Sequence, residues 1–157
     1  MRTCALCLAA FLAAGCSGRN GTETDAEPWG DDIWQVRPTP DPNASGGVRI
    51  PTDLEDAFRE LDRMLHPGLK ARMKGGNQNQ MIEHHFGLGR WMRNNWGLWG
   101  GSDLARFFFR RGIMHPDDMS GFILAQYWNR LHGQPITLPP PLPDDQWQPI
   151  WRRMHEE

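Results

Sequence analysis

The sequence predicts an all-α fold: a small single domain of about four to five helices, with an extended N-terminal linker and a proline-rich C-terminal segment. Between residues 49 and 136, apolar residues recur at the spacing that lines one face of a helix. Capping residues precede these stretches and glycines follow them. No alternation of apolar and polar residues indicates strands, and the chain contains no internal repeat.

The N-terminus has the pattern of a bacterial lipoprotein signal peptide. Arg2 precedes an apolar run over residues 4–14, which is shorter than the roughly 20 residues that a membrane-spanning helix needs. The segment LAAGC at residues 12–16 resembles a lipobox, although alanine stands where leucine is usual, three positions before the cysteine. We therefore expect residues 1–15 to be removed and lipid to be attached to Cys16. An ordinary signal peptide followed by an unrelated cysteine is the alternative.

Lipid on Cys16 would anchor the protein to a membrane of the bacterial cell envelope. Ser17 follows it, and the absence of aspartate at that position favours the outer membrane, with the protein facing the periplasm. Because Cys4 and Cys7 leave with the signal, thiol catalysis, zinc–thiolate sites and internal disulfides are excluded. Secretion and a net charge of −2 argue against nucleic acid as a partner.

Residues 16–48 are predicted to form a flexible linker. They are rich in acidic residues, proline and glycine and poor in core-forming side chains, so they cannot bury enough apolar surface to offset the entropy of ordering. Trp29 and Trp34 interrupt this composition. They would either pack onto the domain or contact a partner.

The helical domain is expected over residues 49–136. Thr52 is the predicted N-cap of the first helix, with Glu55 completing a capping box. The segment 66–68, His-Pro-Gly, ends this helix, and a short helix over 69–74 and a loop with Asn79 as the next cap are expected to follow. The apolar stripe of the first helix comprises Leu54, Ala57, Phe58, Leu61 and Leu65.

A second long helix is expected over residues 80–95. Gly87 and Gly89 each cost about 1 kcal/mol relative to alanine inside a helix, so the pair predicts close approach of another element. One face is expected to carry Ile82, His85 or Phe86, Gly89 and Met92.

Two further helices complete the predicted domain. Ser102 caps a short one that ends at Gly112, and Pro116 opens a longer one that ends at Gly133. Their buried stripes are expected to hold Leu104, Phe107 and Phe108 in the first, and Met119, Phe122, Ile123 and Tyr127 in the second.

Residues 137–157 are expected to form a proline-rich extended connector and a short amphipathic segment. Pro149 permits a helix there only if it starts near Asp145 or Gln146. Its helically spaced apolar residues are Trp147, Ile150, Trp151 and Met154.

The stretches IPTDLEDAF, HFGLGRWMRNNWGLWGGSDL, GIMHPDDMSGFIL and LHGQPI together resemble a bacterial family catalogued only as a domain of unknown function. The family's pattern joins L-G-x-W-x-R-N-x-W-G-L-W to H-P-D-D-M-S. The resemblance covers about Ile50 to Ile136, and it implies a small helical domain and no established activity. The matching positions are Trp91, Arg93, Asn94, Trp96, Gly97, Leu98 and Trp99, followed by His115, Pro116, Asp117, Asp118, Met119 and Ser120.

The first motif allows two interpretations. As a ligand platform, its tryptophans would stack on sugars or cations and Arg93 would hold a carboxylate. As a structural element, Trp96 and Trp99 would plug the core, Asn94 or Asn95 would cap a helix end, and Arg93 would pair with Asp117 or Asp118 of the second motif. The structural interpretation is the one we favour.

The second motif is equally ambiguous. Asp117 and Asp118 suit the first turn of a helix, where negative charge complements the helix dipole. Two carboxylates beside His115 could also serve acid–base chemistry. His84 and His85 do not share a helix face, and no H-E-x-x-H is present, so neither a metal site nor a cofactor is expected.

Three functions remain open at this stage, one of them a mainly structural lipoprotein, and the sequence leans away from an enzyme. The first is a lipid-anchored, non-enzymatic periplasmic domain that binds a protein partner, as an adaptor or an immunity-type protein. The second is a domain that binds or hydrolyses peptidoglycan, using the Trp/Arg/Asn cluster together with His115, Asp117 and Asp118.

Overall fold

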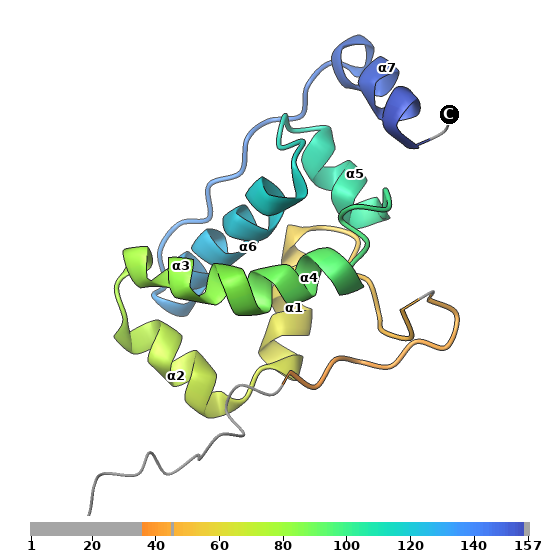
Figure 1. Cartoon of the computed structure of the whole chain (residues 1–157). Helices are drawn as coiled ribbons and strands as arrows, with labels where there is room; N and C mark the ends of the chain where they lie inside the picture. Colours follow the sequence, from red (N-terminus) through yellow and green to blue (C-terminus); the bar gives the residue numbers. More distant parts are fainter. Residues whose placement is uncertain (1–35, 45, 156–157) are drawn as a thin grey trace, which may run out of the picture.

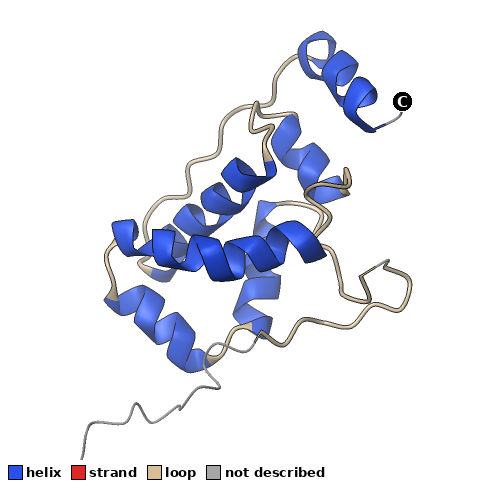
Figure 2. Cartoon of the chain, in the orientation of Figure 1, coloured by secondary structure: helices blue, strands red, loops and turns tan. Residues whose placement is uncertain are grey.

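The computed structural model describes residues 36–44 and 46–155, and these form an all-α domain, as predicted. Helices joined by loops account for the architecture, and no β-strand lies among the described residues (Figures 1 and 2). No helix among them is both long and apolar enough to cross a membrane. The elements are α1 Leu54–Met64, α2 Pro67–Gly75, a 3-10 turn Gln78–Gln80, α3 Met81–His84, a π-helical turn His85–Gly89, α4 Arg90–Asn95, α5 Asp103–Phe109, α6 Pro116–Leu131 and α7 Asp144–His155.

Helix α6 is the centre of the domain, because it contacts α1, α2, α5 and the rod formed by α3, the π-helical turn and α4. The rod crosses in front of α1 and α6 (Figure 1). Each fully buried Phe or Leu at these contacts contributes about 1.5–3 kcal/mol to folding. The core includes Phe58, Leu61, Met92, Trp96, Phe108, Ile123 and Tyr127.

The N-cap of α1 differs from the prediction by one residue. Asp53, not Thr52, caps the helix, and its side chain accepts a hydrogen bond from the backbone N–H of Asp56 at 2.8 Å. Glu55 closes no capping box; its carboxylate instead pairs with Arg130 on α6 at 3.2 Å. An aspartate directly after a threonine competes for the same cap, and its carboxylate is at least as good an acceptor.

The other predicted helix ends are mostly in place. Ser102 caps α5, accepting from the Ala105 N–H at 3.2 Å, and Gly112 and Gly133 have positive φ where the chain leaves a helix. The loop before α3 is capped by Asn77 rather than Asn79, in a capping box with Gln80.

The rod reveals an error in the predicted apolar face. Ile82 and Phe86 are 65% and 74% exposed, whereas Met92 is fully buried. The reason is the π-helical turn, in which the Arg90 N–H reaches back to the His85 carbonyl; it adds a residue to one turn and shifts the inward face. A face read at a uniform helical period therefore points the wrong way at this end of the rod.

Only one of the two rod glycines is explained by close approach. A Cβ on Gly89 would lie 3.2 Å from the Arg93 guanidinium and 3.5 Å from Leu124 on α6, as close packing requires. A Cβ on Gly87 would meet no atom within 4 Å, so the predicted close approach is wrong at that position.

The C-terminal residues pack onto the domain through α7. Trp151 lies edge-on to Phe109 at 5.2 Å, and the Arg106 guanidinium lies 5.3 Å from the Trp151 ring centroid. The helix begins at Asp144, slightly earlier than expected, and holds Pro149 inside it. Of its predicted apolar residues, Trp147 and Trp151 are buried, while Ile150 and Met154 are exposed.

Candidate functional site

Arg93 is the buried centre of a partly exposed polar cluster that joins α4 to the start of α6. Its side chain is only about a tenth exposed, and Nη1 donates to the Ser120 hydroxyl at 2.7 Å. Its Nε lies 2.9 Å from Oδ1 of Asp117. The Ser120 hydroxyl in turn donates to the Asp117 carbonyl at 3.0 Å. The guanidinium is thus engaged within the protein, in the ion pair that the structural interpretation predicts.

Asp117 also lies beside two histidines. Its Oδ1 is 3.7 Å from His85 Nε2, and its Oδ2 is 3.6 Å from His115 Nδ1. The same His115 nitrogen accepts the Asp117 backbone N–H at 3.2 Å and so caps α6. These histidine–carboxylate distances exceed hydrogen-bond reach, so the group is a surface carboxylate flanked by imidazoles. No pattern in the sequence predicts the place of His85 beside Asp117, because the π-helical turn that directs it toward α6 has no local signature.

Of the two tryptophans predicted to lie in the core, only Trp96 is buried there; the prediction for Trp99 is wrong. Trp96 is fully buried and lies edge-on to Trp91 at 5.9 Å. Trp99 is 55% exposed and contacts the His115 ring at 5.5 Å. Between and after them, Gly97 and Gly101 adopt positive φ and reverse the chain, and this reversal turns Trp99 outward.

The remaining predicted residues divide in the same way. Asn95 donates to the Trp91 carbonyl at 2.8 Å and so satisfies the end of α4. Asn94 and Asp118 are exposed. The structure therefore brings Arg93, His115, Asp117 and Trp99 together, and it leaves Asn94 and Asp118 outside the cluster.

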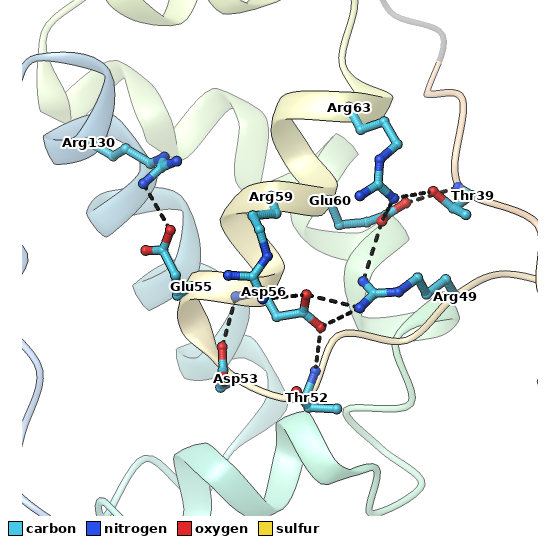
Figure 3. Close-up of polar contacts among 10 residues, drawn as sticks. All are labelled: Thr39, Arg49, Thr52, Asp53, Glu55, Asp56, Arg59, Glu60, Arg63 and Arg130. Carbon is cyan, nitrogen blue, oxygen red and sulfur yellow. Dashed lines mark hydrogen bonds and ion pairs between the residues drawn. The ribbon is translucent and has the colours of Figure 1, made fainter.

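A second polar cluster, which sequence reasoning missed, fastens the segment before α1 onto that helix (Figure 3). Asp56 is almost fully buried, and both of its oxygens accept from Arg49 Nη2, at 2.9 and 2.8 Å. Arg59 and the Thr52 N–H complete its partners. Burial would raise the pKa of Asp56, but the hydrogen bonds from Arg49, Thr52 and Arg59 outweigh it and leave the pKa below its ordinary value.

Glu60 is the second buried carboxylate of this polar cluster. Its side chain is completely buried, yet it accepts from the Thr39 N–H at 2.9 Å and from Arg63 at 2.7 Å (Figure 3). Arg49 Nη1 lies 3.5 Å away. Val36 and Thr39, predicted as part of the free linker, are thus tied to the domain: Thr39 binds Glu60, and Val36 forms an isolated β-bridge with Leu65. The signal was present in the sequence, because Asp56, Arg59, Glu60 and Arg63 stand one helical turn apart.

Several sequence predictions fall outside this description. Cys16, Ser17, Trp29 and Trp34 lie among the residues that the structure does not describe. Within the described ranges, no three His, Cys, Asp or Glu side chains converge in a way that could hold a metal ion.

Comparison with known proteins supplies the classification. The family described as a domain of unknown function (DUF6794) matches residues 50–131, just over half of the chain. A search of curated proteins and a search of solved structures found no match. The matched range begins at Ile50, three residues before the Asp53 cap of α1, and ends at Leu131, the last residue of α6. It therefore contains both motif segments and most of the core. The chain belongs to this family of domains of unknown function.

Proposed function

We propose that the protein is a lipid-anchored, non-enzymatic interaction domain of the bacterial cell envelope, which binds a protein partner through the face that carries Phe86 and Trp99. The observation that carries this proposal is the contrast on that face. Its polar centre, Arg93 with Asp117, is satisfied internally, while two large aromatic side chains beside it project into solvent. Exposed aromatic anchors around a rigid centre are typical of protein-binding surfaces.

The linkage of the two aromatics through the histidines supports a common surface. Phe86 lies edge-on to His85 at 5.7 Å, and Trp99 lies edge-on to His115 at 5.5 Å. Both histidines flank Asp117. Ile82, one helical turn before Phe86, extends the apolar surface. We call Phe86 and Trp99 the aromatic face.

The partner is tested by site-specific photocrosslinking in intact cells. A photoreactive phenylalanine at Phe86 or Trp99 should yield one discrete adduct with another envelope protein. The matched control is the same probe at Asp145, an exposed position on α7. Equal adduct patterns from all three positions, or no adduct from the first two, would remove the support for a partner on the aromatic face.

The anchor is tested separately. Cys16→Ser should abolish incorporation of labelled palmitate and release the protein from the membrane fraction, whereas Cys7→Ser should change neither. Membrane association that persists without lipid on Cys16 would contradict the anchor but not the aromatic face. Fractionation of the two membranes then checks the outer-membrane location that Ser17 favours.

A second candidate function is peptidoglycan binding or hydrolysis. It is favoured by one observation, the partly exposed Asp117 carboxylate between His85 and His115, since such groups can exchange protons with a substrate. The engagement of Arg93 removes the carboxylate-binding arginine on which this idea first rested. Sedimentation with purified peptidoglycan and analysis of muropeptides decide between the two functions. If the protein is not retained by peptidoglycan and the muropeptides are unaltered, this second function is excluded.

A further inference from the structure

The chain turns a corner between α2 and the rod (Figure 1). Two adjoining pockets lie at this corner. One is mainly polar, has a volume of about 350 Å³, and is lined by Arg72, Asn77, Gln80, Glu83 and His84 among others. The other is mainly apolar, has a volume of about 280 Å³, and is lined by Leu69, Leu88 and Trp91 together with Val36 and Gly87. Glu83 and His84 border both. The corner therefore offers a polar and an apolar compartment that share a wall.

Gly87 is the feature that points to a ligand. It lies in the π-helical turn, its φ is not positive, and a Cβ there would meet nothing within 4 Å. Neither backbone conformation nor packing requires a glycine, in contrast to Gly89 on the same turn. The missing side chain keeps one wall of the apolar compartment open, and π-helical turns are frequent at functional sites.

The apolar compartment suits one hydrophobic group. Leu69 and Leu88 are buried, and Trp91 is half-buried, so an incoming ring or short branched chain would exchange water for hydrocarbon and an indole surface. The volume is below that of sites for drug-sized molecules, which favours a small ligand.

The shared wall and the polar compartment carry charges of both signs. Glu83 is exposed and offers a carboxylate. Burial lowers the pKa of His84; Glu83 opposes this effect and Arg72 adds to it, so the imidazole is neutral at pH 7. Arg72 has a contact within the protein and contributes here through its charge. A head group with both an ammonium and a carboxylate complements this arrangement.

We propose that the two compartments form one binding site for a small zwitterionic amphiphile, an amino acid with a large apolar side chain. The side chain would occupy the compartment beside Gly87, the ammonium would lie toward Glu83, and the carboxylate toward Arg72. Glycine lacks the apolar group, and phenylacetate and phenethylamine each lack one charge of the head. These three compounds therefore test the two compartments one at a time.

The experiment follows the methyl NMR signals of Leu69 and Leu88 in the full chain during titration with L-phenylalanine. We expect saturable shifts at both methyl groups with a dissociation constant of about 1 mM or tighter. Phenylacetate and phenethylamine should bind about tenfold more weakly, because each loses one charged hydrogen bond, and glycine should not move the signals. Absence of shifts with L-phenylalanine at about 10 mM overturns the site, and equal binding of all three aromatic compounds overturns the head-group assignment.

Two variants locate the site. Gly87→Leu should fill the apolar compartment and weaken L-phenylalanine at least about tenfold, while the control Phe86→Gln, on the adjacent exposed position, should leave it unchanged. Glu83→Gln should weaken L-phenylalanine but not phenylacetate, which keeps the test sharp even if Gly87→Leu fails to fold. Unaltered binding in both Gly87→Leu and Glu83→Gln overturns the proposal. So does a nuclear Overhauser contact, in the ligand-free protein, between Leu69 or Leu88 and the chain segment before Val36, because that segment would then occupy the compartment.

Discussion

Arg93 on α4 and Asp117 in the first turn of α6 form an ion pair with an Nε–Oδ1 distance of 2.9 Å. This pair joins the two motifs that lie apart in the sequence, and Ser120 reinforces it through a second bond to the guanidinium. The two motifs thus form an internal contact that joins the rod to α6. Around this ion pair, Phe86 and Trp99 are exposed to solvent, and His85 and His115 flank Asp117.

Arg93→Ala should lower the stability of the domain by about 2 kcal/mol, since the charged contact with Asp117 is lost and the buried Ser120 oxygen loses the donor that it accepts from. The cost stays below that of a fully buried pair, because the exposed side of Asp117 regains water. In a domain of this size the loss corresponds to a midpoint about 10 °C lower in thermal unfolding. Asn94→Ala, at the next and exposed position, is the control and should change the midpoint little. An unchanged midpoint for Arg93→Ala would mean that the Arg93–Asp117 pair contributes no stability.

The two rod glycines should respond in opposite directions to the same substitution. Gly89→Ala places a methyl group 3.2 Å from the Arg93 guanidinium and 3.5 Å from Leu124, so it should destabilise the protein. Gly87→Ala meets no atom and should stabilise it by about 0.5–1 kcal/mol, through helix propensity. Chemical denaturation of the two variants measures both signs. Destabilisation by Gly87→Ala would show that the π-helical turn itself requires glycine there.

The second polar cluster, around Asp56 on α1, predicts that the stability of the domain depends on pH. The pKa of Asp56 is lowered in the folded protein, so its contribution is complete above the ordinary aspartate value, near 3.8, and is lost as the pH falls through the lower folded value. Asp56→Asn should therefore destabilise the protein at pH 7, and the difference from wild type should shrink below about pH 4. Unfolding midpoints from pH 7 to pH 3 test this, with the exposed Asp103→Asn as the control. A difference that stays constant over this range would contradict the role of the Asp56 charge.

Trp151 should hold α7 against α5 through Phe109 and Arg106. Trp151→Ala should detach α7 without unfolding the core, because the buried cluster around α6 does not depend on it. Limited digestion with trypsin should then cleave after Arg152 or Arg153 much faster than in wild type. Ile150→Ala, on the exposed side of the same helix, should leave the digestion rate unchanged. Protection of these arginines in Trp151→Ala would show that other contacts anchor the C-terminus.

The sequence by itself determined the helical class and most of the helix ends, because those depend on residues within one turn of each other. Ser102, Gly112 and Gly133 act where they were expected, and the stripe of α6 is largely correct, with Phe122 only partly buried. The Arg93–Asp117 pair was also predictable, since two motifs of complementary charge flank one short helix.

Apart from that pair, the tertiary structure decided which side chains meet and which face solvent. The π-helical turn rotates Phe86 outward and His85 toward Asp117, and no local pattern marks such a turn. The chain reversal at Gly97 and Gly101 exposes Trp99, although a large aromatic side chain favours burial. Glu60 is buried because Arg49, Arg63 and the Thr39 backbone satisfy its charge. Burial is set by partners distant in the chain, whereas capping is set by neighbours, and this difference separates what could be predicted from what could not.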